Sequence, residues 1–250
     1  MRPHSSKAPR GDMVDGIRMA LAAVCGLGWT IAYVLAVRTG VRDKTYCIPL
    51  VALAMNICWE FQFVFFRSAE HMSGSNSEVE GAEVFIGIIW LIVDCGLLYT
   101  VFRFGPNEFP YLPRRVFYAG FIVVLGLAYA GIEVLSREFD DGDVVLTSFG
   151  MNVAMSGLFL AMLAARQSSR GQSMGIAVAK FVGTTSTCIA WFFDTSVYPG
   201  PWLPYCTVAC VLLDVAYIAA LSAVLRKERG RSQLAGDRPE IRDIERNASL

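Results

Sequence analysis

The chain has 250 residues, of which 54% are apolar and only 18% are charged, and its 22 basic residues balance its 22 acidic ones. A soluble domain carries about 25% charged residues, so this composition excludes an ordinary soluble globule. The balanced charge gives no indication of a nucleic-acid partner. Seven stretches of about 20 residues are almost free of charge, and each is long enough to cross a bilayer as a helix. In chain order they are residues 17–37, 47–66, 84–102, 116–134, 145–165, 175–193 and 203–225.

These stretches predict an all-α integral membrane protein with seven transmembrane helices. Only helices and closed barrels satisfy their backbone groups in lipid, and the sequence lacks the alternating segments of a barrel. Residues 1–16 are expected to form an N-terminal tail, residues 17–225 the transmembrane domain, and residues 226–250 a cytoplasmic C-terminal tail. All seven cysteines lie inside the spans without a CxxC spacing, and both histidines lie outside them. We therefore expect no metal site and no cofactor.

The loops differ in charge, and this difference predicts the orientation. The first, third and fifth loops hold eight basic residues, whereas the second, fourth and sixth hold two basic residues among many acids. Loops rich in Lys and Arg remain in the cytoplasm. The N-terminus is therefore expected outside and the C-terminus inside the cell.

Ionisable side chains at membrane depth are costly to bury and usually mark a pathway or a site. At 1.5 Å per helical residue, Glu60 lies roughly 10 Å from the outer end of the second predicted helix. Asp94 and Asp214 lie near the bilayer midplane. Short carboxyl side chains cannot reach the interface from these depths. We predict Glu60 and Asp214 as catalytic residues.

Four ionisable residues admit a simpler interpretation. Glu133 and Asp194 lie within a turn of the interface and are expected to be solvated helix ends. Lys180 is long enough to extend its amine to the cytoplasmic headgroups. Asp94 remains open between a structural acid that pairs with a neighbouring helix and a residue of the site.

Polar and aromatic residues of the same helices are candidates for lining a substrate pocket. Asn56 lies one turn before Glu60 on the same helix face, and Asn152 lies in the outer half of the fifth predicted helix. The deep aromatic residues serve either as packing or as pocket walls, and the sequence leaves both open. The predicted substrate-binding residues are Asn56, Trp59, Phe63, Trp90, Asp94, Asn152, Trp191 and Tyr217.

Five short motifs resemble those of the integral membrane terpene cyclases. That family includes the fungal cyclases of pyripyropene and paxilline biosynthesis and actinobacterial relatives. Pro49, Asn56 and the pair Trp59-Glu60 resemble its second helix. WLIVD at 90–94 is similar to its WxxxD motif, and Met151-Asn152 with Ser156 to its fifth-helix pattern. KFVGT at 180–184 is similar to its KxxGT, and DVAY at 214–217 to its DxxY. The excess of Arg over Lys favours an actinobacterial member in a bacterial plasma membrane.

The resemblance implies a cyclase in which Glu60 and Asp214 form the catalytic pair. Such an enzyme protonates a terminal alkene or an epoxide on a linear prenyl chain, and the resulting cation closes the rings. Burial and a second carboxylate nearby both favour the neutral acid that this step needs. The implied partners are the lipid bilayer and a lipophilic prenylated small molecule with a meroterpenoid, indole or cyclodipeptide head group.

Two other classes of seven-helix protein would also use buried acids. A proton-coupled transporter or a ligand sensor remains the alternative, although the repeated halves of many transporters are not found here. A retinal protein requires a Schiff-base lysine in its last helix, and residues 203–225 contain none.

Overall fold

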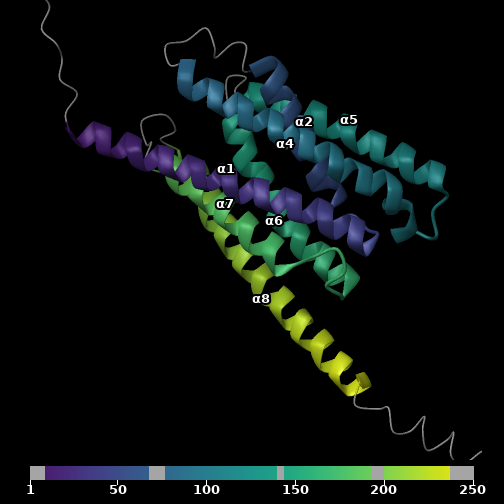
Figure 1. The fold of residues 1–250 in the computed structure, drawn as a ribbon. Helices are drawn as coiled ribbons and strands as arrows, with labels where there is room; N and C mark the ends of the chain where they lie inside the picture. The colour runs from purple at the N-terminus through teal and green to yellow at the C-terminus, as the bar shows by residue number, and fades with distance from the viewer. Residues whose placement is uncertain (1–8, 68–76, 140–143, 193–199, 237–250) are drawn as a thin grey trace, which may run out of the picture.

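The computed structural model describes residues 9–67, 77–139, 144–192 and 200–236, and within them the chain forms helices joined by short turns (Figure 1). These residues contain no strand, which confirms the all-α prediction for them. The helices are α1 (Pro9–Asp43), α2 (Leu50–Gln62) with its π-helical continuation η1 (Phe63–Arg67), α4 (Ser77–Phe104) with the 3-10 turn η2 (Gly105–Glu108), α5 (Arg114–Phe139), α6 (Val145–Arg166), α7 (Met174–Phe192) and α8 (Trp202–Gly236).

Five of these helices contain segments that are long and apolar enough to cross a membrane. The segments are Gly16–Asp43, Val84–Glu108, Arg114–Phe139, Val145–Arg166 and Trp202–Gln233. The apolar helix over Leu50–Phe66 is shorter. The chain is therefore a multi-pass membrane protein by the length and composition of its helices.

Two helices extend into segments that the hydropathy pattern assigned to the tails. α1 begins at Pro9 and α8 continues to Gly236, where it projects beyond the other helices (Figure 1). Hydropathy marks the point at which a helix leaves the bilayer, whereas the helix itself ends only where its backbone hydrogen bonds end. Good helix formers such as Arg, Lys, Glu and Leu dominate residues 225–234, so α8 continues.

The outer surface of the bundle is apolar. Large hydrophobic side chains that are more than half exposed occur on α1, α4, α5 and α8. They include Met19, Leu27, Ile92, Leu127, Val134 and Leu212. In water such surface is unfavourable by about 25 cal/mol per Å², whereas lipid tails are as apolar as these side chains. The polar residues of the spans point inward instead.

Two glycines let α1 and α7 approach each other closely. A Cβ atom on Gly28 would lie 2.8 Å from the Gly183 Cα atom, and one on Gly183 would lie 2.8 Å from Cδ1 of Trp29. Small residues at a crossing let two membrane helices approach closely. The glycine of the KFVGT motif therefore brings Trp29 against α7.

The connections that follow α1, α4 and α6 lie together at one end of the bundle. Arg170 donates to the carbonyl oxygens of Asp43 and Lys44 at 3.2 and 3.0 Å. It also pairs with Glu108 at 2.6 Å. Gly171 has a φ of 72° and donates its N–H to the Asp43 carboxylate at 2.9 Å, a conformation that glycine adopts without strain. Since every second connection lies at this end, successive helices run in alternating directions.

Candidate active site

Glu60 lies in a buried polar cluster built by three helices. Asn56, one turn earlier on α2, donates through Nδ2 to Glu60 Oε1 and to Asp94 Oδ2 of α4, each at 2.9 Å. The Tyr33 hydroxyl of α1 donates to Glu60 Oε1 at 3.3 Å. Glu60 and Asp94 have no exposed surface. Pro49 precedes the first turn of α2, and its carbonyl accepts the Leu53 N–H at 2.9 Å, which starts the helix that carries Asn56 and Glu60.

The Asn56 amide bridges one oxygen of each carboxyl group, so Glu60 and Asp94 lie side by side in this cluster. Among the described residues, no donor reaches Glu60 Oε2 or Asp94 Oδ1, and no Lys or Arg forms an ion pair with either acid. Two ionised carboxylates side by side without a cation would repel strongly at low dielectric. The arrangement therefore suits a site that holds a proton.

Asp214 lies in a second buried cluster with a different composition. Lys180 of α7 donates from Nζ to Asp214 Oδ1 of α8 and to Ser156 Oγ of α6, both at 2.7 Å. The side chains of Lys180 and Asp214 are each 2% exposed. The Lys180 Nζ also lies 5.9 Å from the centroid of the Trp29 ring and 5.8 Å from that of Phe159. The ammonium group is thus held by an anion, a hydroxyl and two aromatic faces.

The expectation that Lys180 extends to the headgroups is therefore wrong. An opposite charge at 2.7 Å and two ring faces replace the hydration that the interface would offer. Sequence spacing along α7 could not reveal this, because the partners come from three other helices.

Glu60 and Asp214 have different immediate partners, and α1 connects their clusters. Trp29 and Tyr33 lie one turn apart on α1, with ring centroids separated by 5.4 Å. Tyr33 contacts Glu60, and Trp29 faces Lys180. Neither aromatic residue was among the predicted site residues, although their spacing of four places them on one helix face.

Three predicted aromatic residues lie on or near the α2 side of the bundle. Trp90 donates its indole N–H to Thr30 Oγ1 at 3.1 Å, and its ring lies 6.3 Å from that of Tyr33, so it borders the Glu60 cluster. Trp59 donates to the Val144 carbonyl at 2.8 Å and stacks on Phe63 at 5.2 Å. Trp59 and Phe63 are half-buried and attach α2 to the start of α6.

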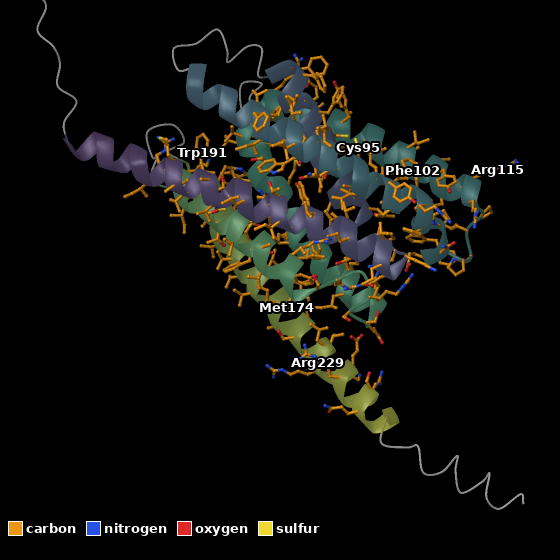
Figure 2. The ribbon with its side chains drawn as sticks, in the orientation of Figure 1. Cys95, Phe102, Arg115, Met174, Trp191 and Arg229 are labelled. Carbon is orange, nitrogen blue, oxygen red and sulfur yellow. The ribbon has the colours of Figure 1, made fainter. Side chains whose placement is uncertain are left out.

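The other predicted residues are spread along the bundle. Tyr217 is buried and donates to Gln172 Oε1 at 3.0 Å, near the α6–α7 connection. Trp191 packs 6.4 Å from Phe149, and Figure 2 shows it at the end opposite to Arg115. Asn152 is half-buried, and its backbone carbonyl accepts the Ser156 hydroxyl at 2.9 Å.

Of the two acids expected at solvated helix ends, Glu133 and Asp194, the structure describes only Glu133. Glu133 is partly exposed and pairs with Arg137 one turn later, as expected for a solvated helix end. Asp194 and Phe193, the last residue of the sixth predicted span, lie outside the described residues.

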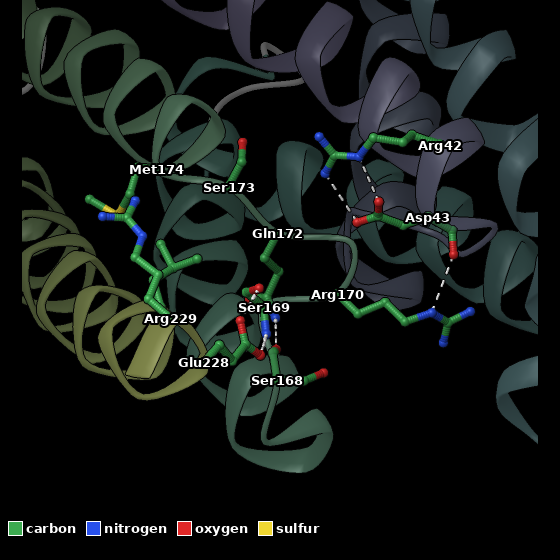
Figure 3. Close-up of a pocket in the computed structure, with 11 residues that line it drawn as sticks. Arg42, Asp43, Ser168, Ser169, Arg170, Gln172, Ser173, Met174, Glu228 and Arg229 are labelled. Carbon is green, nitrogen blue, oxygen red and sulfur yellow. Dashed lines mark hydrogen bonds and ion pairs between the residues drawn. The ribbon is translucent and has the colours of Figure 1, made fainter. Parts of the chain in front are cut away.

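A surface depression of ≈ 640 Å³ lies where the end of α1, the α6–α7 connection and α8 meet (Figure 3). Arg42 donates to Asp43 at 2.7 Å, and Glu228 accepts from the hydroxyl and the backbone N–H of Ser169. None of the buried carboxyls lines this depression. Its polar contacts attach the extension of α8 to the bundle, and it is separate from the candidate active site.

Curated relatives of this chain are fungal terpene cyclases. The chain is 25% identical to the Pyr4-family terpene cyclase mfmH of Annulohypoxylon moriforme, over 85% of this chain and 88% of the relative. It is 26% identical to terpene cyclase andB of Emericella variicolor (86% and 91% covered) and 27% identical to terpene cyclase pyr4 of Aspergillus fumigatus (92% and 95% covered). The inference of an actinobacterial member in a bacterial plasma membrane is not borne out by these relatives. No solved structure matches the chain.

The family model supports the same assignment over most of the chain. It matches residues 4–227, a range that includes all the described helices except the last part of α8. This range also contains both buried clusters and all five motifs. The match favours a cyclase over the transporter or sensor that the sequence left as the alternative. The chain belongs to the Pyr4-like transmembrane terpene cyclases.

Proposed function

We propose that this membrane terpene cyclase starts ring closure by protonating a terminal alkene or an epoxide of a prenylated substrate, without a metal ion. The observation that carries the proposal is the Glu60 cluster, in which buried carboxyls lie together without a cation among the described residues. An alkene is a very weak base, so its proton donor must be a neutral acid in a dry environment. A carboxyl that burial and a like charge keep neutral meets this need.

Glu60 is the proton donor in this proposal. Its Oε1 accepts hydrogen bonds from Asn56 and Tyr33, while its Oε2 has no donor among the described residues. Hydrogen bonds to Oε1 stabilise the negative charge that develops as the proton leaves. The Tyr33 and Trp90 rings nearby offer aromatic faces to the cation that forms on the prenyl chain.

Asp214 has a different role in the proposal from the one that the sequence favoured. Asp214 lies beside the Lys180 ammonium group at 2.7 Å, whereas Glu60 lies beside a second acid. Asp214 Oδ2 has no partner among the described residues and is available as an acceptor. We infer that Asp214 accepts the proton that the final cation loses. One proton enters the substrate and one leaves it, so the product is an isomer of the substrate.

We further propose that α2 and α7 cross the membrane together with the five longer helices, with the N-terminus outside and the C-terminus in the cytoplasm. The loop charges support this orientation. The alternating helix directions and the inward-facing polar clusters support seven crossings, because α2 and α7 carry Glu60 and Lys180 between the longer helices. The substrate would be a lipophilic prenylated molecule with a meroterpenoid, indole or cyclodipeptide head group.

Membranes that contain the protein, incubated with a farnesylated indole and with its terminal epoxide, provide the test. We expect a product of identical mass and different retention time in chromatography coupled to mass spectrometry. Glu60→Gln and Asp214→Asn keep shape but remove the carboxyl function, so each should lower turnover by about 10²–10⁴-fold or more. Glu138→Gln, at the exposed end of α5, is the matched control and should retain wild-type turnover. Undiminished cyclisation by Glu60→Gln would refute the assignment of the donor.

A further inference from the structure

We propose that Glu60 and Asp94 hold a single proton between their carboxyl groups, so that Asp94 is the second half of the proton donor. The shared proton follows from the geometry of the cluster, whereas its use in catalysis rests on the proposed function. Sequence alone left Asp94 between a structural acid and a substrate contact.

The Asn56 amide fixes the two carboxyls relative to each other. Its NH₂ group has two hydrogens, and Nδ2 donates to Glu60 Oε1 and to Asp94 Oδ2 at the same distance of 2.9 Å. The amide therefore occupies one oxygen of each acid. The remaining oxygens, Glu60 Oε2 and Asp94 Oδ1, have no donor among the described residues. A proton shared between the two carboxyl groups would form one hydrogen bond that joins both acids.

The surroundings of the pair supply no compensating cation among the described residues. α1 contributes the neutral phenol of Tyr33. The acid that α5 carries within its apolar stretch, Glu133, pairs with Arg137 one turn later. α6 carries a single charge, Arg166, which binds Thr45 at its far end. The α7 lysine is engaged by Asp214. Two negative charges would thus lie uncompensated, whereas one proton leaves a single shared charge.

The shared proton can enter the reaction without another reagent. The alkene π electrons, or an epoxide lone pair, form the new bond to hydrogen, and the bonding pair stays on the carboxyl pair. Both acids are then ionised while the substrate is a cation, so opposite charges form together. The cation later loses one proton to the Asp214 carboxylate, and proton exchange through water restores both sites. Asp94 keeps the proton on the pair at neutral pH, and the Asn56 and Tyr33 donors stabilise the charge left by its departure.

Infrared spectra of the protein in lipid nanodiscs test the shared proton without any substrate. At neutral pH we expect one carbonyl band of a protonated carboxyl that changes in both Glu60→Gln and Asp94→Asn and stays unchanged in Glu138→Gln. Without the neighbouring charge, Glu60 in Asp94→Asn should lose its proton at a lower pH than the pair does in the wild type. Two protonated bands, no band, or a wild-type titration of Glu60 in Asp94→Asn would each overturn the proposal. If Asp94→Asn does not fold, Asp94→Ser makes the same test.

The pH dependence of cyclisation then tests the catalytic part. Asp94→Asn should lose about 10²–10⁴-fold of the rate at neutral pH. It should recover rate as the pH falls, because Glu60 is then protonated again, and Asp94→Glu should retain activity at neutral pH. A purely structural role would give a loss that does not depend on pH, and this result would contradict the catalytic role of Asp94. A wild-type protein that shows the shared band but cyclises neither test substrate would refute the proposed function and leave the shared proton established.

Discussion

Removal of the Lys180 amine tests how much the buried ion pair contributes to the stability of this protein. Lys180→Met keeps much of the side-chain volume but leaves the Asp214 carboxylate without its cation. At the observed separation of 2.7 Å, an effective dielectric constant of about 20 gives an attraction of about 6 kcal/mol. Desolvation of both ions, which are each 2% exposed, offsets part of this attraction. Loss of one partner from a buried pair costs about 3–5 kcal/mol, and we expect this loss in Lys180→Met.

The double variant Lys180→Met/Asp214→Asn distinguishes the stability cost of the unpaired Asp214 charge from the cost of the lost contact. Asparagine is neutral, so the double variant should recover most of the stability that the single variant loses, although it should stay inactive. Unfolding in detergent micelles, followed by heating or by denaturant, measures the stability, and the cyclisation assay measures turnover. Equal stability of Lys180→Met and the wild type would refute the reasoning, because it would mean that Asp214 does not depend on the ammonium group.

Two further predictions concern the helix contact and the topology. Gly183→Val places a side chain against α1 where a Cβ atom already has a neighbour at 2.8 Å, so it should lower the unfolding free energy by about 1–3 kcal/mol. Gly126→Val is the control on α5, where the added Cβ meets nothing within 4 Å, and a similar loss there would contradict the packing argument. Reporter fusions at Gly74 and at Arg170 should lie on opposite sides of the membrane, with Gly74 outside. Identical reporter signals at both positions would show that the number of crossings between them is even.

The sequence predicted the polar residues of the site better than their partners. Burial cost alone selected Glu60 and Asp214, and the described chain buries both acids. The contact between Asn56 and Glu60 was also predictable, because residues four apart share a helix face. The contacts of Asp94 and Lys180 were not predictable, since each partner lies on another helix. Helix periodicity fixes the direction of a side chain on its own helix but carries no information on which helix lies opposite.

The all-α membrane architecture followed from the sequence by itself, because a lipid solvent requires long apolar segments with internally bonded backbones. The tertiary structure alone decided how the charges are distributed. The close approach of α1 and α7 at Gly183 brings Trp29 over Lys180, and the pairing of α2 with α4 brings Asp94 to Glu60. Electrostatic energies depend on distances of a few ångströms and on the exclusion of solvent, and packing between helices sets both. For this reason only the tertiary structure shows that Asp214 lies beside a cation, whereas Glu60 and Asp94 lie beside each other.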